Sequence, residues 1–277
     1  MLRSLRDLER YTVSTTDGDI GSVVNFLLDD ERWVVRYLVV ETGGFLKGRR
    51  VLISPIFFGQ AEWSTRRFHL ALTMDQVRNS PSIDVDKPIS RQHERDYYRH
   101  YGYPYYWGAL GLWGGGAYPN SLEAGKWSEV PGRPDEPPGD THLRSAQEVT
   151  GYRIHGSDGE IGHVADFIVD DETWDVRYLV VDTSNWWLGK KVLVAPYWAT
   201  YIFWDDKMVQ VDLSRQAVRS SPEWDAVAAL NRDYEAQLYD HYGSPAYWSR
   251  EGLPEGAVHA ARLDGFSHSV TPTRLDP

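Results

Sequence analysis

The residues with the clearest capacity for chemistry in this chain occur in pairs. Asp29-Asp30-Glu31 and Asp170-Asp171-Glu172 are runs of carboxylates, and carboxylate oxygens are the ligands that a hard cation such as Ca²⁺ prefers. Neighbouring residues next to a strand point to opposite faces, however, so consecutive carboxylates form a poor cation cage. We therefore expect both runs to be solvated turns and predict no metal site.

Two arginines are unusual because they stand inside otherwise apolar segments. Arg36 lies in RYLVVET and Arg177 in RYLVVDT. In one interpretation the aliphatic stem lies along the sheet and the guanidinium pairs with a nearby carboxylate, such as Asp29 or Asp170. In the other interpretation the guanidinium anchors an interface. Pairing is the more ordinary role, and both arginines remain candidate interface residues.

Motifs for catalysis are missing from the sequence. The chain contains no Cys, so thiolate catalysis, disulfides and Cys-ligated zinc are excluded. Its nine His form no H-E-x-x-H motif, and there is no G-x-S-x-G nucleophile elbow or Gly-Lys-Ser/Thr phosphate loop. We expect a protein that is not an enzyme, with no catalytic residues and no cofactor.

These features recur because the sequence repeats itself at a constant offset of 141 residues. Five segments show the repeat: TDGDIG with SDGEIG, RYLVVET with RYLVVDT, GRRVLISP with GKKVLVAP, VRNSP with VRSSP, and HYGYPYYW with HYGSPAYW. An offset that holds from Asp17 to Trp107 indicates duplication of one folding unit. The elements that position any site must therefore be present twice.

Each unit is predicted to be mainly β. Asp17-Gly18 between apolar segments favours a hairpin with a type I′ turn. The strand that follows, 20–28, has a predicted buried face of Val24, Phe26 and Leu28. A returning strand is predicted over 33–40, and further short strands near 50–53, 57–62 and 67–70. Short, closely spaced strands separated by Gly and Pro predict a small β-barrel.

Helical extensions are predicted to follow each barrel. Thr73 precedes a short helix, and Ser90 caps a polar amphipathic helix that ends at Gly102. Residues 108–141 are rich in Gly and then in Pro, as in a linker. The predicted organisation is repeat 1 with its extension (1–108), linker (109–141), repeat 2 with its extension (142–250) and a tail (251–277).

Aromatic residues close both repeats. The segments are YGYPYYW at 101–107 and YGSPAYW at 242–248. Aromatics beside Pro give rigid contact area, which suits an interface. The alternative is a lid that folds back on its own or the sister barrel. The candidate interface residues are Arg36, Arg177, Tyr101, Tyr105, Trp107, Tyr242, Tyr247 and Trp248.

Charge limits the classes of partner. The net charge is −11, with +1 over residues 1–108 and −7 over residues 142–250. A strongly acidic chain is a poor match for nucleic acid, which needs a basic surface. No apolar window has the length of a membrane span, and the first residues lack the apolar core of a secretory signal. The predicted location is the cytoplasm.

Together, the D-G-x-I-G turn, the acidic hairpin, RYLVV[ED]T, G[RK][RK]VL[IV]-x-P and the closing V-R-x-S-P resemble the PRC-barrel family. The resemblance covers about residues 5–85 and 146–226. That family includes the cytoplasmic part of the photosynthetic reaction centre H subunit and a ribosome maturation factor. The resemblance implies tandem PRC-like barrels that bind proteins and do no catalysis. It also implies packing against a membrane complex, although the H subunit's membrane helix is not found here.

The leading hypothesis is therefore a non-enzymatic scaffold or adaptor that binds protein partners, associates peripherally with a membrane complex and forms homo-oligomers. One alternative is a ligand-binding or hydrolytic protein with a pocket between the barrels, lined by Arg36, Arg177 and the aromatic closings. A second alternative is a factor that associates with RNA or the ribosome, which the charge disfavours. The partner itself cannot be read from the residues.

Overall fold

The structure, a computed structural model, describes residues 1–44, 48–81, 89–107, 109, 111–125, 142–184, 189–225 and 230–250. The predicted tail and residues 126–141 of the predicted linker lie outside these ranges. Among the helices in these ranges, none has the length and apolar character needed to cross a bilayer.

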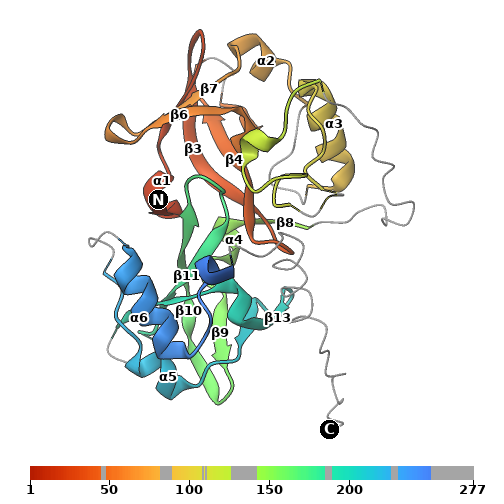
Figure 1. Ribbon diagram of the computed structural model, residues 1–277. Coiled ribbons are helices and arrows are strands. Elements are labelled where there is room, and N and C mark those ends of the chain that lie inside the picture. The colour runs from red at the N-terminus through yellow and green to blue at the C-terminus, as the bar shows by residue number, and fades with distance from the viewer. Residues whose placement is uncertain are drawn as a thin grey trace. The chain divides into compact units, whose positions relative to one another are not determined.

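Repeat 1 begins with a short strand and a helical turn and continues as a run of strands followed by two helices (Figure 1). Its elements are β1 (Leu2–Ser4), α1 (Leu5–Leu8), β2 (Thr12–Thr15), β3 (Gly18–Asp29), β4 (Val34–Thr42), β5 (Arg50–Ile53), η1 (Pro55–Phe57), β6 (Phe58–Glu62), η2 (Trp63–Thr65), β7 (Arg67–Leu70), α2 (Met74–Arg78) and α3 (Arg91–Tyr101). The 3₁₀ turn η3 (Pro119–Ser121) follows within the predicted linker.

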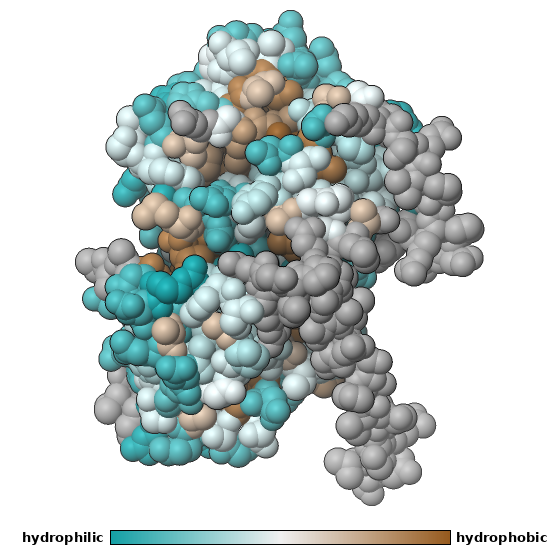
Figure 2. All heavy atoms as spheres, viewed as in Figure 1, coloured by the Kyte–Doolittle hydropathy of each residue, from teal (hydrophilic) through white to brown (hydrophobic). Residues whose placement is uncertain are grey.

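Repeat 2 has the same order of strands and α-helices. Its elements are β8 (Leu143–Ser145), α4 (Ala146–Val149), β9 (Arg153–Gly156), β10 (Gly159–Asp170), β11 (Val176–Asp182), β12 (Lys191–Val194), η4 (Pro196–Trp198), β13 (Ala199–Phe203), β14 (Met208–Val211), α5 (Arg215–Ser220), α6 (Arg232–Tyr242) and η5 (Tyr247–Arg250). In Figure 2 the visible face over α5 and α6 is mostly hydrophilic, as expected for helices of the acidic repeat.

The fold is mainly β, with two mixed sheets. The strand order is β5-β4-β3-β2-β7-β6 in one sheet and β12-β11-β10-β9-β14-β13 in the other. The β2–β7 and β9–β14 pairs are parallel, whereas the β2–β3, β3–β4, β4–β5, β6–β7, β9–β10 and β13–β14 pairs are antiparallel. Among the described strands, no pairing joins the two ends of either path, so closure into barrels stays a prediction.

Each sheet gains a further strand from the opposite repeat. β1 pairs with β10, with Leu2 opposite Asp170. β8 pairs with β3, with Leu143 opposite Asp29. Leu143 is the counterpart of Leu2 at the offset of 141 residues, and Asp29 is the counterpart of Asp170. The two exchanges therefore have the same register. We call β1 and β8 the exchanged arms.

Polar side chains fix both exchanged arms in place. Asp171 pairs with Arg3 of β1 at 2.6 Å, and Asp30 pairs with Arg144 of β8 at 2.9 Å. One step further along, Ser4 Oγ donates to Asp166 at 2.5 Å, and Asn25 Nδ2 donates to Ser145 Oγ at 2.8 Å. The acidic turns predicted to be solvated are therefore partly occupied by arginines from the exchanged arms.

The compact units of the chain do not follow the repeat boundaries. Unit 1 comprises Met1–Gly151 and Val164–Val180, and unit 2 comprises Tyr152–His163 and Val181–Pro277. Unit 1 thus contains repeat 1, both exchanged arms, and the β10–β11 turn with the adjoining parts of these two strands. The sites described below lie in unit 1 unless stated otherwise.

The predicted hairpin at Asp17-Gly18 is present, but its turn type was wrong. Thr15 pairs with Gly18, so the loop residues are Thr16 and Asp17. A type I′ turn needs positive φ at both loop residues, and the only positive φ here, +155°, belongs to Gly18. Asp17 shapes the loop by accepting hydrogen bonds from the Thr15 hydroxyl and the Met74 backbone, at 2.9 and 2.8 Å.

The predicted buried face of β3 was right for Phe26 and Leu28 and wrong for Val24. Phe26 and Leu28 are each 1% exposed, whereas Val24 is half-buried and Val23 is buried. The pairing with β4 shifts by one residue between Val23 and Asn25. A β-bulge there exchanges the two faces of the strand, which simple alternation cannot anticipate.

The helix ends follow the sequence signals. Ser90 caps α3 by accepting from the His93 backbone, and Gly102 ends the helix with φ of +72°. Gly243 ends α6 in the same way, with φ of +63°. Capping at both ends sets the length of α3, and α3 carries side chains of the buried cluster described next.

Candidate functional site: a buried ion cluster and a surface groove

A buried polar cluster of unit 1 begins with an ion pair inside the sheet. Arg36 of β4 bonds the Asp29 carboxylate at the end of β3 through Nη2 at 2.8 Å and Nε at 3.1 Å. The Arg36 side chain is 0% exposed. Its guanidinium carbon lies 3.9 Å from the ring centroid of Tyr106 and 4.8 Å from that of Trp113. The pairing with Asp29 expected from the sequence is confirmed.

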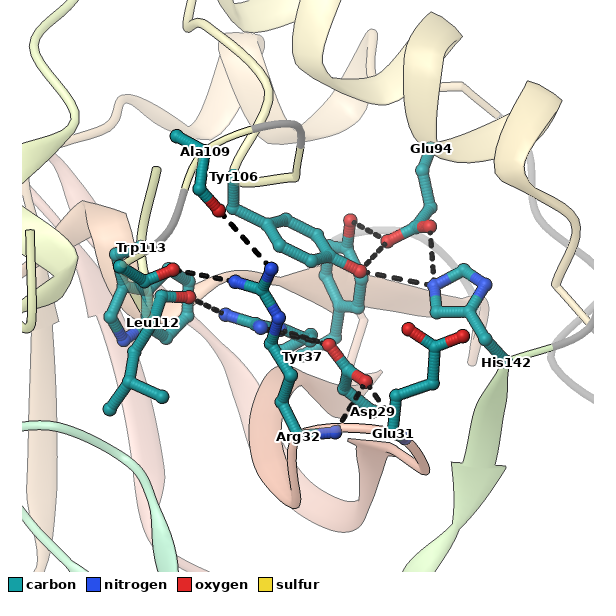
Figure 3. A network of polar contacts seen from close by, with 12 residues as sticks. Asp29, Glu31, Arg32, Tyr37, Glu94, Tyr106, Ala109, Leu112, Trp113 and His142 are labelled. Atoms are coloured by element: carbon teal, nitrogen blue, oxygen red, sulfur yellow. Dashed lines mark hydrogen bonds and ion pairs between the residues drawn. The ribbon is translucent and has the colours of Figure 1, made fainter. Parts of the chain in front are cut away.

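Glu94 of α3 forms the second half of this cluster (Figure 3). Its Oε1 accepts from the hydroxyls of Tyr37 and Tyr106, both at 2.9 Å. Its Oε2 lies 2.9 Å from His142 Nε2 and accepts from Arg91 Nη1 at 3.1 Å. Tyr37 belongs to β4, Arg91 to α3 itself, Tyr106 to the aromatic closing that follows α3, and His142 directly precedes β8, so Glu94 joins α3 and its closing to two segments that are distant in sequence.

Burial and charge act in opposite directions on the titratable groups of the cluster. Burial alone would raise the pKa of Asp29, but the charges of Arg36 and His142 and the hydrogen bonds from Arg36 and the Arg32 backbone together outweigh burial, and the pKa is lowered. Burial would lower the pKa of His142, yet the hydrogen bond and charge of Glu94 raise it above 6.5. Both shifts favour the charged forms, which stabilises the ionised cluster.

The cluster also holds a loop from the predicted linker. Arg36 Nη1 donates to the Leu112 carbonyl at 2.5 Å, and Arg32 Nη1 donates to the Gly111 carbonyl at 2.6 Å. Trp113, which is 0% exposed, donates through Nε1 to the Thr173 carbonyl at 2.8 Å. Although residues 109–141 were assigned to a linker, the described part that contains Trp113 is packed as core.

As arranged, the cluster is closed to a substrate. Its central side chains, Arg36, Asp29, Glu94 and His142, are each at most 4% exposed. Each makes hydrogen bonds inside the protein, with His142 Nδ1 a buried atom that lacks a protein partner. Within the described ranges, no group of three or more His, Asp or Glu side chains is placed to hold a metal ion. The geometry therefore suits a structural clamp.

A second feature of unit 1 is an open surface groove of about 770 Å³. Aromatic side chains from three segments line it: Phe58 and Trp63 around β6, Tyr118 beside η3, and Trp174 in the β10–β11 turn. Pro55, Pro119, Asn120, Asp171 and Glu172 are among its other lining residues. We call this feature the aromatic groove.

Part of the aromatic groove is open to solvent. Tyr118 is 48% exposed, which makes it one of the few large hydrophobic side chains exposed in the described ranges. The ring centroids of Phe58 and Trp174 lie 5.2 Å apart, and Trp174 is buried, so these two packed rings form the floor of the groove. The guanidinium of Arg3 lies 3.5 Å from the centroid of the Trp63 ring. Unlike the ion cluster, this region is partly open to solvent.

A model of the PRC-barrel domain matches the chain over residues 2–58 and 143–214. The two matches fall on the two repeats, and each begins at an exchanged arm. The chain contains two PRC-barrel domains. No curated protein matches the chain significantly.

Around the first PRC-barrel domain, the aromatic closing packs onto its own repeat. Tyr101 lies 4.5 Å from Phe57, and Tyr105 stacks on Trp107 at 4.5 Å between ring centroids. Trp107 is half-buried and lies 4.5 Å from the Arg91 guanidinium. These contacts match the alternative of a lid on the same repeat, and they leave an interface role for these residues as a prediction.

The second aromatic closing, in unit 2, repeats this arrangement. Tyr242 lies 4.7 Å from Trp198. Trp248 packs 4.2 Å from the Arg232 guanidinium, and Tyr247 donates to Glu235 at 3.0 Å. In unit 1, Arg177 pairs with Asp175 at 3.0 Å and Asp170 at 3.8 Å. An opening lined by Arg36 is not what the structure shows, because that side chain is fully buried.

Sequence reasoning missed Glu94, Tyr106, Trp113 and His142 as members of one cluster. A signal existed for the first two, since Arg91, Glu94 and Tyr106 recur as Arg232, Glu235 and Tyr247 at the same offset. No repeat signal exists for His142, because the matching residue is Met1. Trp113 stands in a Gly-rich stretch that composition assigns to a linker.

Proposed function

We propose that this tandem PRC-barrel protein is a non-enzymatic scaffold that binds protein partners. The observation that carries the proposal is the contrast between its two sites. The titratable side chains of the ion cluster are buried and paired, whereas the open site is an aromatic groove of about 770 Å³. Aromatic side chains in a partly exposed concave site are typical anchors of protein recognition.

The structural role of the ion cluster supports a scaffold. The cluster joins β4, α3, the Trp113 loop and His142, and Trp113 in turn bonds the carbonyl of Thr173, the neighbour of the groove residue Trp174. A rigid surface loses little conformational entropy when a partner binds. The PRC-barrel domain itself suggests a general interaction module without catalysis, and the resemblance to the H subunit extends the proposal to a partner in a membrane complex.

The test is a pull-down with the tagged protein, with soluble and membrane fractions analysed separately by mass spectrometry. A scaffold should recover a stoichiometric protein partner, and Tyr118→Ala should lose it. Trp107→Ala is the matched variant in the aromatic closing, and it should retain the partner if the groove is the binding surface. If Trp107→Ala loses the partner and Tyr118→Ala retains it, the binding surface is the aromatic closing and not the groove. Recovery of the bait alone from both fractions would contradict a scaffold.

A further inference from the structure

The β8 arm is fastened to the rest of unit 1 by polar contacts at its head. The His142 Nε2 atom, directly before β8, lies 2.9 Å from Glu94 Oε2 and 3.1 Å from the Tyr106 hydroxyl (Figure 3). The backbone N–H of Asp30 donates to the His142 carbonyl at 2.9 Å, and Arg144 Nε donates to the Asp30 carboxylate at 2.9 Å. Because β8 is only three residues long, the protonation of His142 and Asp30 bears directly on whether the arm stays docked.

The charges around the imidazole balance without its proton. The titratable and charged groups that face His142 are Asp29 and Asp30 at the end of β3, Arg91 and Glu94 of α3, and Tyr106. Each of these three carboxylates is paired with an arginine. The pairs are Asp29 with Arg36, Asp30 with Arg144, and Glu94 with Arg91. The imidazole proton is therefore one that the cluster can gain or lose near neutral pH.

Proton binding and docking of the arm favour each other. Burial lowers the pKa of His142, but the hydrogen bond and charge of Glu94 outweigh burial and raise that pKa above 6.5. Burial raises the pKa of Asp30 to about 6, against the hydrogen bond and charge of Arg144. When the arm undocks, both groups become solvated and their pKa values return toward 6.5 and 3.8. Both protons therefore bind the docked state more tightly, and docking weakens as the pH rises.

The β1 arm is a matched case without an imidazole, since Met1 is the counterpart of His142 at the repeat offset. The Asp171 N–H donates to the Met1 carbonyl at 2.9 Å, and the Met1 ammonium pairs with the Asp171 carboxylate. Burial also raises the pKa of Asp166, to which the Ser4 hydroxyl donates. Both arms thus lie against a carboxyl group whose pKa is raised, and the imidazole distinguishes β8 from β1.

We propose that the β8 arm is a proton-operated latch, which is docked on β3 when its head is protonated and is released as His142 and Asp30 lose their protons. Release uncovers the edge of β3 at Leu27–Asp29, the residues with which β8 pairs. An uncovered strand edge is open to pairing with another segment. The pH therefore controls access to this edge, whether or not the protein is a scaffold.

The test is native-state hydrogen exchange of the unmodified full chain, measured by NMR from pH 5 to pH 7.5. The Asp30 amide reports the β8 arm and the Asp171 amide reports the β1 arm, because each is bonded to the head of its arm. Division by the intrinsic exchange rate at each pH gives the opening constant, which is the ratio of released to docked molecules. For the Asp30 amide, this constant should rise about tenfold between pH 5 and pH 7 as the Asp30 carboxyl loses its proton.

Two variants separate the two protons. Loss of the His142 proton should add a further rise of the opening constant above pH 6.5, and His142→Gln should remove this part. Asp30→Asn should remove most of the tenfold rise, measured at the same backbone amide. At the Asp171 amide we expect no rise of the opening constant between pH 6.5 and pH 7.5, because the β1 arm has no imidazole.

Three results would overturn the latch. The first is an opening constant at the Asp30 amide that stays the same from pH 5 to pH 7.5 in the unmodified chain. The second is a matching rise above pH 6.5 at the Asp171 amide, which would show that the whole fold loosens and not one arm. The third is persistence of the full rise in both His142→Gln and Asp30→Asn.

Discussion

The two repeats contain the same polar residues around their long helices but bury them to different extents. In repeat 1, Arg91, Glu94 and Tyr106 meet with side-chain exposures of 11% for Arg91 and 1% for Glu94. In repeat 2, Arg232, Glu235 and Tyr247 meet in the same way, but the Arg232 side chain is 54% exposed. Glu94 also pairs with His142, whose counterpart at the repeat offset is Met1. Duplication supplied one set of residues, and the surroundings decide what each contact contributes.

A second difference concerns the arginines of the central strands. Position 34 is Val and its counterpart 175 is Asp. Arg177 therefore pairs with Asp175 at 3.0 Å and lies 3.8 Å from Asp170, whereas Arg36 pairs with Asp29 alone. Arg177 is 15% exposed and Arg36 is 0% exposed. Buried charges cost far more to leave unpaired than charges that water can reach.

The largest expected effect follows from this pair of arginines. Arg36→Met leaves Asp29 buried without its counter-charge, and we expect the free energy of unfolding to fall by about 3–5 kcal/mol. Arg177→Met should cost less, about 2 kcal/mol, because Arg177 is 15% exposed and one of its partners, Asp170, is 21% exposed, although the other, Asp175, is buried. Urea titrations followed by circular dichroism measure both. Adding Asp29→Asn to Arg36→Met should restore part of the loss, and equal losses in the two single variants would contradict the comparison.

A smaller difference is expected for the two helix glutamates. Glu94→Gln removes the charge that four partners share, and we expect a loss of about 3 kcal/mol in the free energy of unfolding. Glu235→Gln should lose about 1 kcal/mol, because its partner Arg232 is half exposed and solvent screens this pair. The same urea titrations apply. A larger loss of unfolding free energy in Glu235→Gln than in Glu94→Gln would show that solvent exposure does not determine how much each glutamate stabilises the fold.

The pH dependence should separate the repeats further. Because the pKa of His142 is raised above 6.5 in the folded protein, its protonated form adds stability that is fully present below pH 6.5. This contribution is lost as the pH rises through the folded-state pKa. The difference in unfolding free energy between the wild type and His142→Gln should therefore shrink from about pH 6 to about pH 9. Glu94→Gln should flatten this trend, while Glu235→Gln should leave it unchanged.

The smallest effect on stability is expected at the edge strands. β13 exposes Tyr201 and Phe203, at 58% and 37%, where repeat 1 has Gln60 and Glu62. Replacing Tyr201 by Gln and Phe203 by Glu should change the free energy of unfolding by less than about 0.5 kcal/mol. Sedimentation velocity over a concentration series should then show weaker self-association. Identical profiles for the wild type and this variant would argue against homo-oligomers formed through β13.

Sequence reasoning predicted the elements well because local signals specify them. Capping residues such as Ser90 and Gly102 mark the ends of α3, and the repeat identifies the strands twice. The same reasoning failed at Val24, where a bulge reverses the alternation. It also missed the ion cluster and the groove, since both unite segments that are distant in sequence. Local patterns carry no information about which distant segments meet, and Trp113 shows this most clearly.

The exchanged arms have a consequence for how the chain matures during translation. The partner residues of β1, Ile168–Asp170, follow it in the chain by more than 160 positions. At about 5–20 residues per second, β1 waits roughly 10–30 s on the ribosome before it can pair. A nascent chain therefore exposes an unfinished sheet until repeat 2 emerges. Limited proteolysis of stalled chains should show that residues 2–4 gain protection only after residue 170 has left the exit tunnel.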